Sequence, residues 1–181
     1  VIISDYEKGM VSKEICQAVI KIANRYKKPV AVDPKGTDYT KYRGATVITP
    51  NLKEAAIAAA TVILDEKSLN RAGRALLSVA KGPYIIITRG KEGMTLFDKK
   101  GSSFIPAVPR EVFDITGAGD TVISALVLSL SSGASMKEAA AISNFAGSVV
   151  VGKIGTAPCF RSELEEAVEG HEPIIKKIKS L

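Results

Sequence analysis

The sequence predicts an α/β protein in which a mostly parallel sheet is covered by helices on both faces. Short apolar runs alternate with segments whose apolar residues recur every three or four positions over residues 1–88, a pattern typical of strand–helix–strand units. The run Tyr84–Thr88 is fully apolar up to its final threonine, as expected of a parallel strand buried on both sides. The string Asp98-Lys99-Lys100-Gly101 lies between two further apolar runs and indicates a hairpin that adds an antiparallel edge to the sheet.

Strands and helices are expected to alternate in the first half of the chain. The expected strands are residues 1–4, 29–32, 46–49 and 84–88. The expected helices are residues 12–26, 53–60 and 66–81. Ser12 is placed to cap the first of these helices, Pro50 suits the approach to the second, and Gly82-Pro83 ends the third.

The second half is expected to be mainly helical after the hairpin. The hairpin strands are residues 94–97 and 102–106, and the helices are residues 119–131, 136–151, 162–169 and 172–180. Because repeats, linkers and low-complexity tracts are absent from these 181 residues, we expect a single domain that spans residues 1–181. The first residues already read as a buried strand, which indicates a fragment of a longer domain.

The composition indicates a globular protein. Hydrophobic residues make up 46% of the chain and charged residues 24%, both ordinary values, and no apolar run reaches the roughly 18 residues needed to cross a bilayer. Cys16, Cys159 and the single histidine, His171, offer neither a zinc spacing nor a disulfide framework. We therefore expect no membrane partner and a reducing, cytoplasmic location.

The formal net charge of +6 raises the question of a nucleic-acid partner. Part of this charge lies in lysines at residues 27–28, 99–100 and 176–179, which solvated helix ends and a hairpin tip explain more simply. Nucleic-acid binding typically needs basic residues on one face with aromatic side chains between them. Aromatic residues are only 6% of the chain and tryptophan is absent, so we expect no nucleic acid.

The stretch Asp114-Ile115-Thr116-Gly117-Ala118-Gly119-Asp120, followed by an apolar helix, is the most informative part of the sequence. Two glycines one residue apart allow a nest of N–H groups that binds anions, and the positive end of the helix favours phosphate oxygens at the same place. Asp120 cannot bind phosphate, but it can accept a proton from a hydroxyl that attacks one. This combination suits a phosphoryl transferase; a tight turn is the alternative reading of the glycines alone.

The complete string resembles the D-x-T-G-A-G-D signature of the ribokinase-like (PfkB) carbohydrate kinases. Other glycine-rich motifs do not fit, because no G-x-x-x-x-G-K-S/T occurs and Val122 stands where a dinucleotide fingerprint needs its third glycine. The resemblance implies a ribokinase-like fold and an ATP-dependent sugar kinase. It also implies that Asp120 is the catalytic base and that the amides of Gly117, Ala118 and Gly119 hold the transferring phosphoryl group.

Asn51 and Glu54 lie three residues apart in the first turn of an expected helix, where they share a face. Taken alone, they are well explained as a helix cap and its capping-box partner. An N-x-x-E occurs in the same order in ribokinase-like kinases, where it contacts the ATP phosphates and magnesium. The resemblance therefore implies that Asn51 and Glu54 bind the nucleotide, and that Glu54 organises Mg²⁺ through water.

A second nucleotide-binding segment is implied by the loop after the strand at 84–88. Thr88, Arg89, Gly90 and Gly93 belong to a glycine-containing loop that is similar to the nucleotide loop of the family, although alone it would be a plain turn. Asn144 falls 24 residues after Asp120, where related kinases place a residue beside the adenine. A polar spot on a helix of small residues is the alternative for Asn144.

A monovalent cation is a further expectation from the resemblance. Asp114 and Thr116, with main-chain groups around Val150, Lys153 and Gly155, match the place where family members hold such an ion. Oxygen ligands of this kind suit K⁺. The resemblance thus implies ATP and Mg²⁺ as cofactors, with K⁺ as an addition.

Four strings narrow the resemblance to the heptose 7-phosphate kinase branch, the kinase domain of bifunctional ADP-heptose synthases. They are Ser4–Gly9, Asp33–Asp38, Tyr42–Thr46 and Thr49–Glu54. The string Asp33-Pro34-Lys35-Gly36-Thr37-Asp38 is the most specific, because a generic sugar kinase does not need a lysine there. Glu7 departs from the small residue expected in the first string, which leaves the geometry of that loop open.

The resemblance implies that Asp5, Lys8 and Lys35 contact the substrate. A lysine ammonium can supply a point charge to a phosphate that the sugar already carries, whereas a solvated loop charge is the alternative for each lysine. The implied reaction is transfer from ATP to D-glycero-β-D-manno-heptose 7-phosphate, which gives the 1,7-bisphosphate used for lipopolysaccharide core synthesis. Another sugar or a nucleoside as acceptor stays open.

The resemblance covers only the C-terminal part of such a kinase domain. The N-terminal strands and the β-lid that closes over the sugar are expected to be missing, and the full-length protein is expected to form a homodimer through that lid. Since phosphoryl transfer needs water to be excluded, a nucleotide-binding fragment without turnover of its own is the alternative function.

Overall fold

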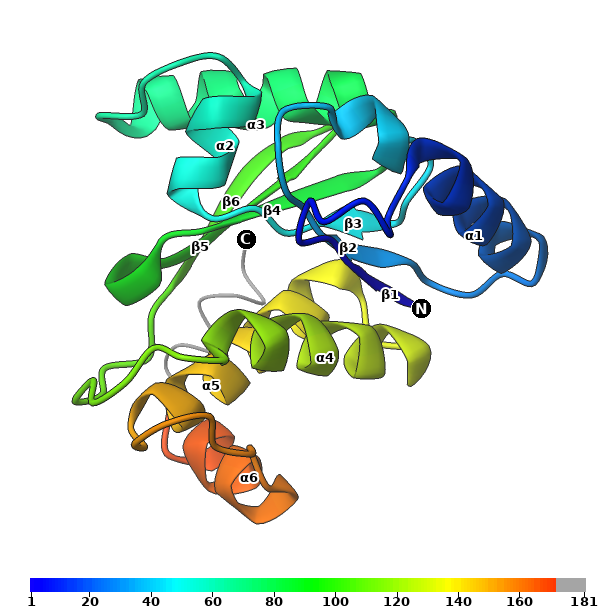
Figure 1. Cartoon of the computed structure of the whole chain (residues 1–181). Helices are drawn as coiled ribbons and strands as arrows, with labels where there is room; N and C mark the ends of the chain where they lie inside the picture. Colours follow the sequence, from blue (N-terminus) through cyan, green and yellow to red (C-terminus); the bar gives the residue numbers. More distant parts are fainter. Residues whose placement is uncertain (172–181) are drawn as a thin grey trace. The chain divides into compact units, whose positions relative to one another are not determined.

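The computed structural model describes residues 1–171, which form two compact units (Figure 1). The first unit contains residues 1–89 and 95–103. Among the described residues, the second contains residues 90–94 and 104–171. The helix expected at residues 172–180 lies outside the described residues.

Six strands form one sheet in simple sequential order, β1-β2-β3-β4-β5-β6. Their bounds are Ile2–Ser4, Ala31–Asp33, Val47–Ile48, Tyr84–Thr88, Gly93–Asp98 and Gly101–Pro106. The first four strands are parallel. The connections from β4 to β5 and from β5 to β6 are too short for a crossover, so these strands run antiparallel. The predicted parallel sheet with a hairpin is confirmed.

Three α-helices connect the parallel strands of the first unit: α1 (Lys13–Arg25) lies between β1 and β2, and α2 (Leu52–Ala58) and α3 (Glu66–Ala80) both lie between β3 and β4. Right-handed crossovers between strands in sequential order place these helices on the same face of the sheet, and Figure 1 shows α2 and α3 over one face of the strands. The side chain of Ser12 caps α1 as predicted, with its Oγ 3.3 Å from the N–H of Ile15.

The core of the first unit joins these helices to the strands. It contains Ile3, Val32, Ile48, Ile85 and Ile87 from the strands, Cys16, Ile20 and Ala23 from α1, and Leu69, Leu76 and Ala80 from α3. Ile86, which alternates with its neighbours and faces the other way, is also fully buried. Cys16 is completely buried and is a small member of this core.

The second unit is built on the helices α4 (Ala118–Ser131), α5 (Met136–Val151) and α6 (Arg161–Glu169). A side chain at Gly147 would come within 2.8 Å of Val122, so α5 needs this glycine to pack closely on α4. A small core of Val108, Phe145, Val149 and Ala167 joins α5 to α6. Within residues 1–171, no helix is long and apolar enough to span a bilayer.

Candidate active site

The Asp114–Asp120 loop of the second unit is held by the Asp114 carboxylate. Its Oδ1 accepts hydrogen bonds from the Thr116 N–H at 2.9 Å and the Thr116 hydroxyl at 2.7 Å, and its Oδ2 accepts the Gly155 N–H at 3.1 Å. These bonds, led by the one from the Thr116 hydroxyl, lower the pKa of Asp114. The carboxylate therefore stays ionised and ties the loop to the segment that follows α5.

Gly117 has a structural reason to be glycine. It is the N-cap of α4 with φ of +76°, a left-handed conformation that side chains disfavour, and an added Cβ would lie 3.1 Å from the Thr156 methyl group. The N–H of Ala118 donates to the Ile115 carbonyl at 3.2 Å. One of the three amides predicted to hold a phosphoryl group is thus already engaged in the turn.

At Gly119, by contrast, neither the backbone conformation nor the packing requires a glycine. It lies in the first turn of α4, its φ is not positive, and nothing lies within 4 Å of a Cβ added there. Glycine inside a helix costs about 1 kcal/mol relative to alanine, so the residue is unfavourable for the helix alone. The space above it lies at a helix N-terminus, where the amides lack intrahelical partners and the dipole favours anions. Asp120 is adjacent and exposed.

The structure brings together the residues predicted to hold a monovalent cation. Asp114, Thr116 and the Gly155 backbone are joined by the hydrogen bonds above, and the Lys153 N–H donates to the Val150 carbonyl at 3.0 Å. Both carboxylate oxygens of Asp114 already accept hydrogen bonds. The K⁺ site stays a prediction.

Asn51 and Glu54 form a complete capping box at the start of α2. The N–H of Glu54 donates to Asn51 Oδ1 at 2.9 Å, and the N–H of Asn51 donates to Glu54 Oε2 at 3.0 Å. The other carboxylate oxygen, Oε1, lies 2.7 Å from Lys35 Nζ. The structural reading of N-x-x-E is therefore confirmed, and the nucleotide role stays a prediction.

The donor set around Glu54 is consistent with a hydrated magnesium ion. Among residues 1–171, no group of three or more histidine, cysteine or carboxylate side chains could hold a metal ion by itself. Mg²⁺ usually keeps several waters and is held by one or two carboxylates together with substrate phosphates. A single oriented carboxylate such as Glu54 suits that mode of binding.

In the predicted nucleotide loop, residues 88–93, some residues already have structural partners and others face open space. Thr88 pairs with Asn51 in an isolated parallel bridge, which places the two predicted nucleotide residues side by side. Arg89 makes an ion pair with Glu66, with Nη1 2.7 Å from Oε1. An added Cβ at Gly93 would lie 2.2 Å from the Ile105 carbonyl oxygen, so that glycine is required by packing. Gly90 has a positive φ and open space around it.

Asn144 lies on α5 and is largely buried. Its Nδ2 donates to the Pro106 carbonyl at 2.8 Å, which ties α5 to the end of β6. This contact fits the alternative reading of a satisfied polar residue on a helix of small residues. The adenine contact stays a prediction.

Asp5 is buried at the end of β1 and has several partners. Its Oδ1 accepts the Glu7 N–H at 2.8 Å, and its Oδ2 accepts the Tyr42 hydroxyl at 2.6 Å and an ion pair from Lys41. Burial alone would raise the pKa of Asp5, but the hydrogen bonds from Lys41, Tyr42 and Glu7 outweigh it and lower the pKa. Asp5 thus anchors the loops that carry Lys35 and Lys8, while Lys8 is exposed. The substrate contacts of Asp5, Lys8 and Lys35 stay predictions.

Sequence reasoning assigned no role in the site to Lys41 or Tyr42, although Tyr42 begins one of the four strings that narrow the resemblance. Tyr42 also accepts the Lys35 N–H at 3.2 Å, and burial, followed by its bond to Asp5, raises its pKa. The available signal was a pair of tyrosines three residues apart after the Asp33–Asp38 string, where they form a short 3₁₀ helix, Tyr39–Tyr42. Among the described residues, the buried hydroxyls of Ser4 and Tyr39 have no hydrogen-bond partner.

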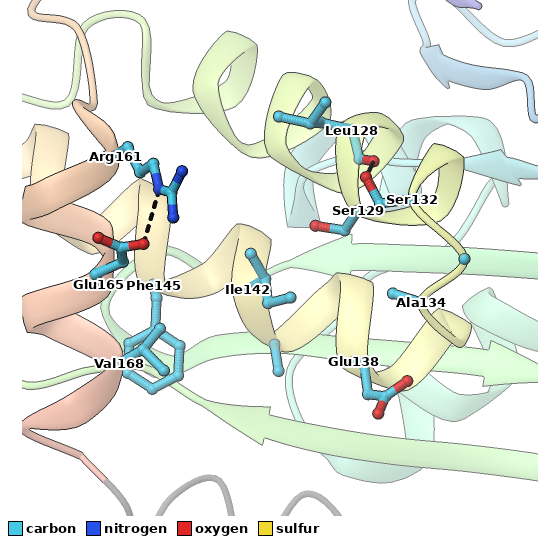
Figure 2. Close-up of a pocket in the computed structure, with 12 residues that line it drawn as sticks. Leu128, Ser129, Ser132, Ala134, Glu138, Ile142, Phe145, Arg161, Glu165 and Val168 are labelled. Atoms are coloured by element: carbon cyan, nitrogen blue, oxygen red, sulfur yellow. Dashed lines mark hydrogen bonds and ion pairs between the residues drawn. The ribbon is translucent and has the colours of Figure 1, made fainter.

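The second unit also contains a cavity between its helices. It has a volume of about 890 Å³ and is lined by the end of α4, the first half of α5 and one side of α6 (Figure 2). Arg161 and Glu165 form an ion pair across adjacent turns of α6 at its rim. None of the residues predicted for catalysis or binding lines it, so the candidate chemistry does not depend on it.

Comparisons with known proteins extend this description. The family model described as pfkB family carbohydrate kinase matches residues 6–163. The bifunctional protein HldE of Geobacter metallireducens is 48% identical over the whole chain, and that of Wolinella succinogenes is 45% identical over 92% of it. The chain spans 37% and 35% of the lengths of these two proteins.

Solved structures show the same fold. Phosphofructokinase-2 from Escherichia coli, in a complex with potassium, superposes with a TM-score of 0.81 at 20% identity, over 93% of this chain and 56% of its own. Ribokinase from Thermotoga maritima gives a TM-score of 0.74 at 23% identity, over the same shares. The predicted ribokinase-like α/β fold is therefore confirmed.

Proposed function

This chain belongs to the pfkB family of carbohydrate kinases, and we propose that it takes part in ATP-dependent phosphorylation of D-glycero-β-D-manno-heptose 7-phosphate. The proposal is supported by HldE proteins that are 42–48% identical to this chain. The chain spans only about 37% of the first of these relatives. We therefore propose that its two units are the C-terminal part of a sugar kinase domain.

The observation that carries the proposal is the open position at Gly119 beside Asp120. We assign the anomeric hydroxyl of the heptose to Asp120, whose carboxylate accepts the hydroxyl proton. The hydroxyl oxygen forms a bond to the γ-phosphorus of ATP, and the bond from that phosphorus to the β–γ bridging oxygen breaks to release ADP. Of the Gly117–Gly119 amides, those of Gly117 and Gly119 would stabilise the charge on the transferring group, since the Ala118 amide is engaged in the turn. A side chain at position 119 would occupy the approach.

The remaining assignments follow the arrangement of each unit. Asn51 and Glu54 would hold the divalent ion, which when bound neutralises charge on the phosphate oxygens. The loop at residues 88–93 and Asn144 would seat the nucleotide, with K⁺ near Asp114 and Thr116. Lys35 and Lys8 would face the 7-phosphate of the sugar, while Asp5 supports their loops.

A second candidate function is nucleotide binding without turnover. It is favoured by the chain's coverage of only 56% of phosphofructokinase-2, because a partial kinase excludes water poorly and phosphoryl transfer needs that exclusion. In this case the chain binds ATP but releases no ADP with any acceptor.

An acceptor panel tests both candidates. ADP release by the 181-residue chain is measured with heptose 7-phosphate, fructose 6-phosphate and ribose, and ATP binding is measured by calorimetry. Release with heptose 7-phosphate alone supports the proposed acceptor. ADP release only with another acceptor supports the kinase assignment but contradicts heptose 7-phosphate as the acceptor. ATP binding without ADP release supports the second candidate function.

A further inference from the structure

One ion pair in the first unit joins residues that the proposed function assigns to different ligands. Lys35, assigned to the acceptor phosphate, places its Nζ 2.7 Å from Oε1 of Glu54, assigned to the divalent cation. We propose that Lys35 serves both sites: it neutralises Glu54 while no cation is bound, and it turns to the acceptor phosphate when a cation replaces it. This inference rests on the proposed function.

Glu54 is the fixed member of the pair. Its side chain is 13% exposed, and its second oxygen accepts the Asn51 N–H at 3.0 Å in the capping box. Moving the carboxylate would break this hydrogen bond of the capping box and leave the Asn51 N–H without its partner. A cation that approaches Glu54 therefore meets a carboxylate that is already oriented.

Lys35 is the movable member. Its side chain is 48% exposed and carries a strongly hydrated ammonium on a flexible four-carbon stem. Its backbone is held, because its N–H donates to the Tyr42 hydroxyl oxygen at 3.2 Å and that hydroxyl donates to Asp5 at 2.6 Å. The ammonium can therefore swing away from Glu54 while the main chain of the loop stays in place.

The energetics favour an exchange. An ion pair with one half-exposed member contributes little net stability, so a divalent cation can displace the lysine at small cost. The displaced ammonium then carries an uncompensated charge that attracts a phosphate. Because linkage is reciprocal, an anion bound to Lys35 should also favour a cation at Glu54. The alternative is a purely structural ion pair, in which case removing Lys35 does not change cation affinity.

The competition is tested without any sugar, by titrating Mn²⁺ as a stand-in for Mg²⁺ and detecting free Mn²⁺ by electron paramagnetic resonance. The proteins are the full chain and its Lys35→Met, Lys35→Arg and Lys53→Met variants. Lys53 is an exposed lysine beside Glu54 and controls for the loss of one positive charge. Thermal unfolding verifies that each variant is folded.

We expect Lys35→Met to bind Mn²⁺ about two- to fivefold more tightly than the unmodified chain, the range set by the usual strength of exposed ion pairs. Lys35→Arg and Lys53→Met should change the affinity little. An equal gain in Lys35→Met and Lys53→Met, no gain in Lys35→Met, or no Mn²⁺ binding by any of these proteins would each overturn the proposal.

A second titration tests the acceptor side. Heptose 7-phosphate is titrated by calorimetry with and without Mg²⁺, and Mg²⁺ should tighten binding about two- to fivefold in the unmodified chain and in Lys53→Met. Lys35→Met should lose this dependence, and full retention contradicts the shared role. If Lys35→Met gains Mn²⁺ affinity but no protein binds heptose 7-phosphate, the acceptor assignment is wrong while the competition at Glu54 stands.

Discussion

The two groups of candidate residues differ in how their polar atoms are used. In the first unit, Glu54, Lys35 and Asp5 are all engaged in ion pairs or hydrogen bonds. In the second unit, Asp120 is exposed beside a glycine whose Cβ position is empty. The first group therefore has to exchange partners in order to bind a ligand, whereas the second is open to a ligand as it stands. We therefore expect substitutions in the first group to act mainly on stability and ligand exchange, and those in the second group to act mainly on turnover.

The largest expected effect is on turnover, and it comes from Asp120 in the second unit. Asp120→Asn removes the proposed base but keeps the shape of the side chain, so kcat should fall by about 10²- to 10⁴-fold while ATP affinity changes little. Steady-state ADP release and ATP calorimetry measure the two quantities, and the exposed Glu111→Gln is the control. If Asp120→Asn retains nearly full turnover, Asp120 is not the catalytic base.

In the first unit, substitution of Asp5 should instead lower the free energy of unfolding. Asp5→Asn leaves Lys41 without its carboxylate, and breaking a buried ion pair costs about 3–5 kcal/mol. Urea unfolding of the variant and of the unmodified chain measures the difference in free energy of unfolding. A loss below about 0.5 kcal/mol, as expected of an ordinary surface position, would show that Asp5 is not the anchor described here.

The pH dependence of stability should follow from the same carboxylate. Despite its burial, the hydrogen bonds to Asp5 hold its pKa in the folded chain below the ordinary value of 3.8, so the unfolded chain binds more protons and stability rises with pH in that range. The contribution is present above about pH 4 and is lost as the pH falls through the folded pKa. In urea unfolding at pH 3 and pH 6, Asp5→Asn should lose less stability between the two than the unmodified chain does.

The smallest changes in the free energy of unfolding are expected for alanine at Gly117 and at Gly119, and they should have opposite signs. Gly117→Ala should destabilise by about 1–2 kcal/mol, because the N-cap needs a positive φ, whereas Gly119→Ala should stabilise the helix by roughly 0.5–1 kcal/mol. If the kinase turns over, Gly119→Ala should nonetheless lower ADP release at least as much as Gly117→Ala. Thermal unfolding measures the change in stability of each variant, and ADP release measures its activity. Equal losses of stability in the two variants would contradict the open position at Gly119.

The sequence predicted the fold well because its signals are local. All the expected strands and helices within residues 1–171 occur with boundaries that differ by at most two residues, since apolar periodicity and caps such as Ser12 and Asn51 act over a few positions. The capping box at Asn51 and Glu54 was also foreseen. The hairpin followed from the string at Asp98–Gly101.

The engaged contacts were not predictable in the same way. Lys35 meets Glu54 across 19 residues, and Tyr42 meets Asp5 across 37, so no periodic pattern links them. Arg89 was expected at a nucleotide, but it pairs with Glu66 on α3. Such pairings depend on which loops the parallel strands bring to the same edge of the sheet, and that is a property of the folded chain.

The central claim, that the open N-terminus of α4 receives the transferring phosphoryl group, is tested most directly by nuclear magnetic resonance. The ¹⁵N-labelled chain is titrated with a non-hydrolysable ATP analogue and Mg²⁺, which requires no turnover. The account predicts that the amide of Gly119 shows a large, saturable shift that ADP does not reproduce. A Gly119 amide that does not respond while other amides do, or a chain with no response at all, would contradict it.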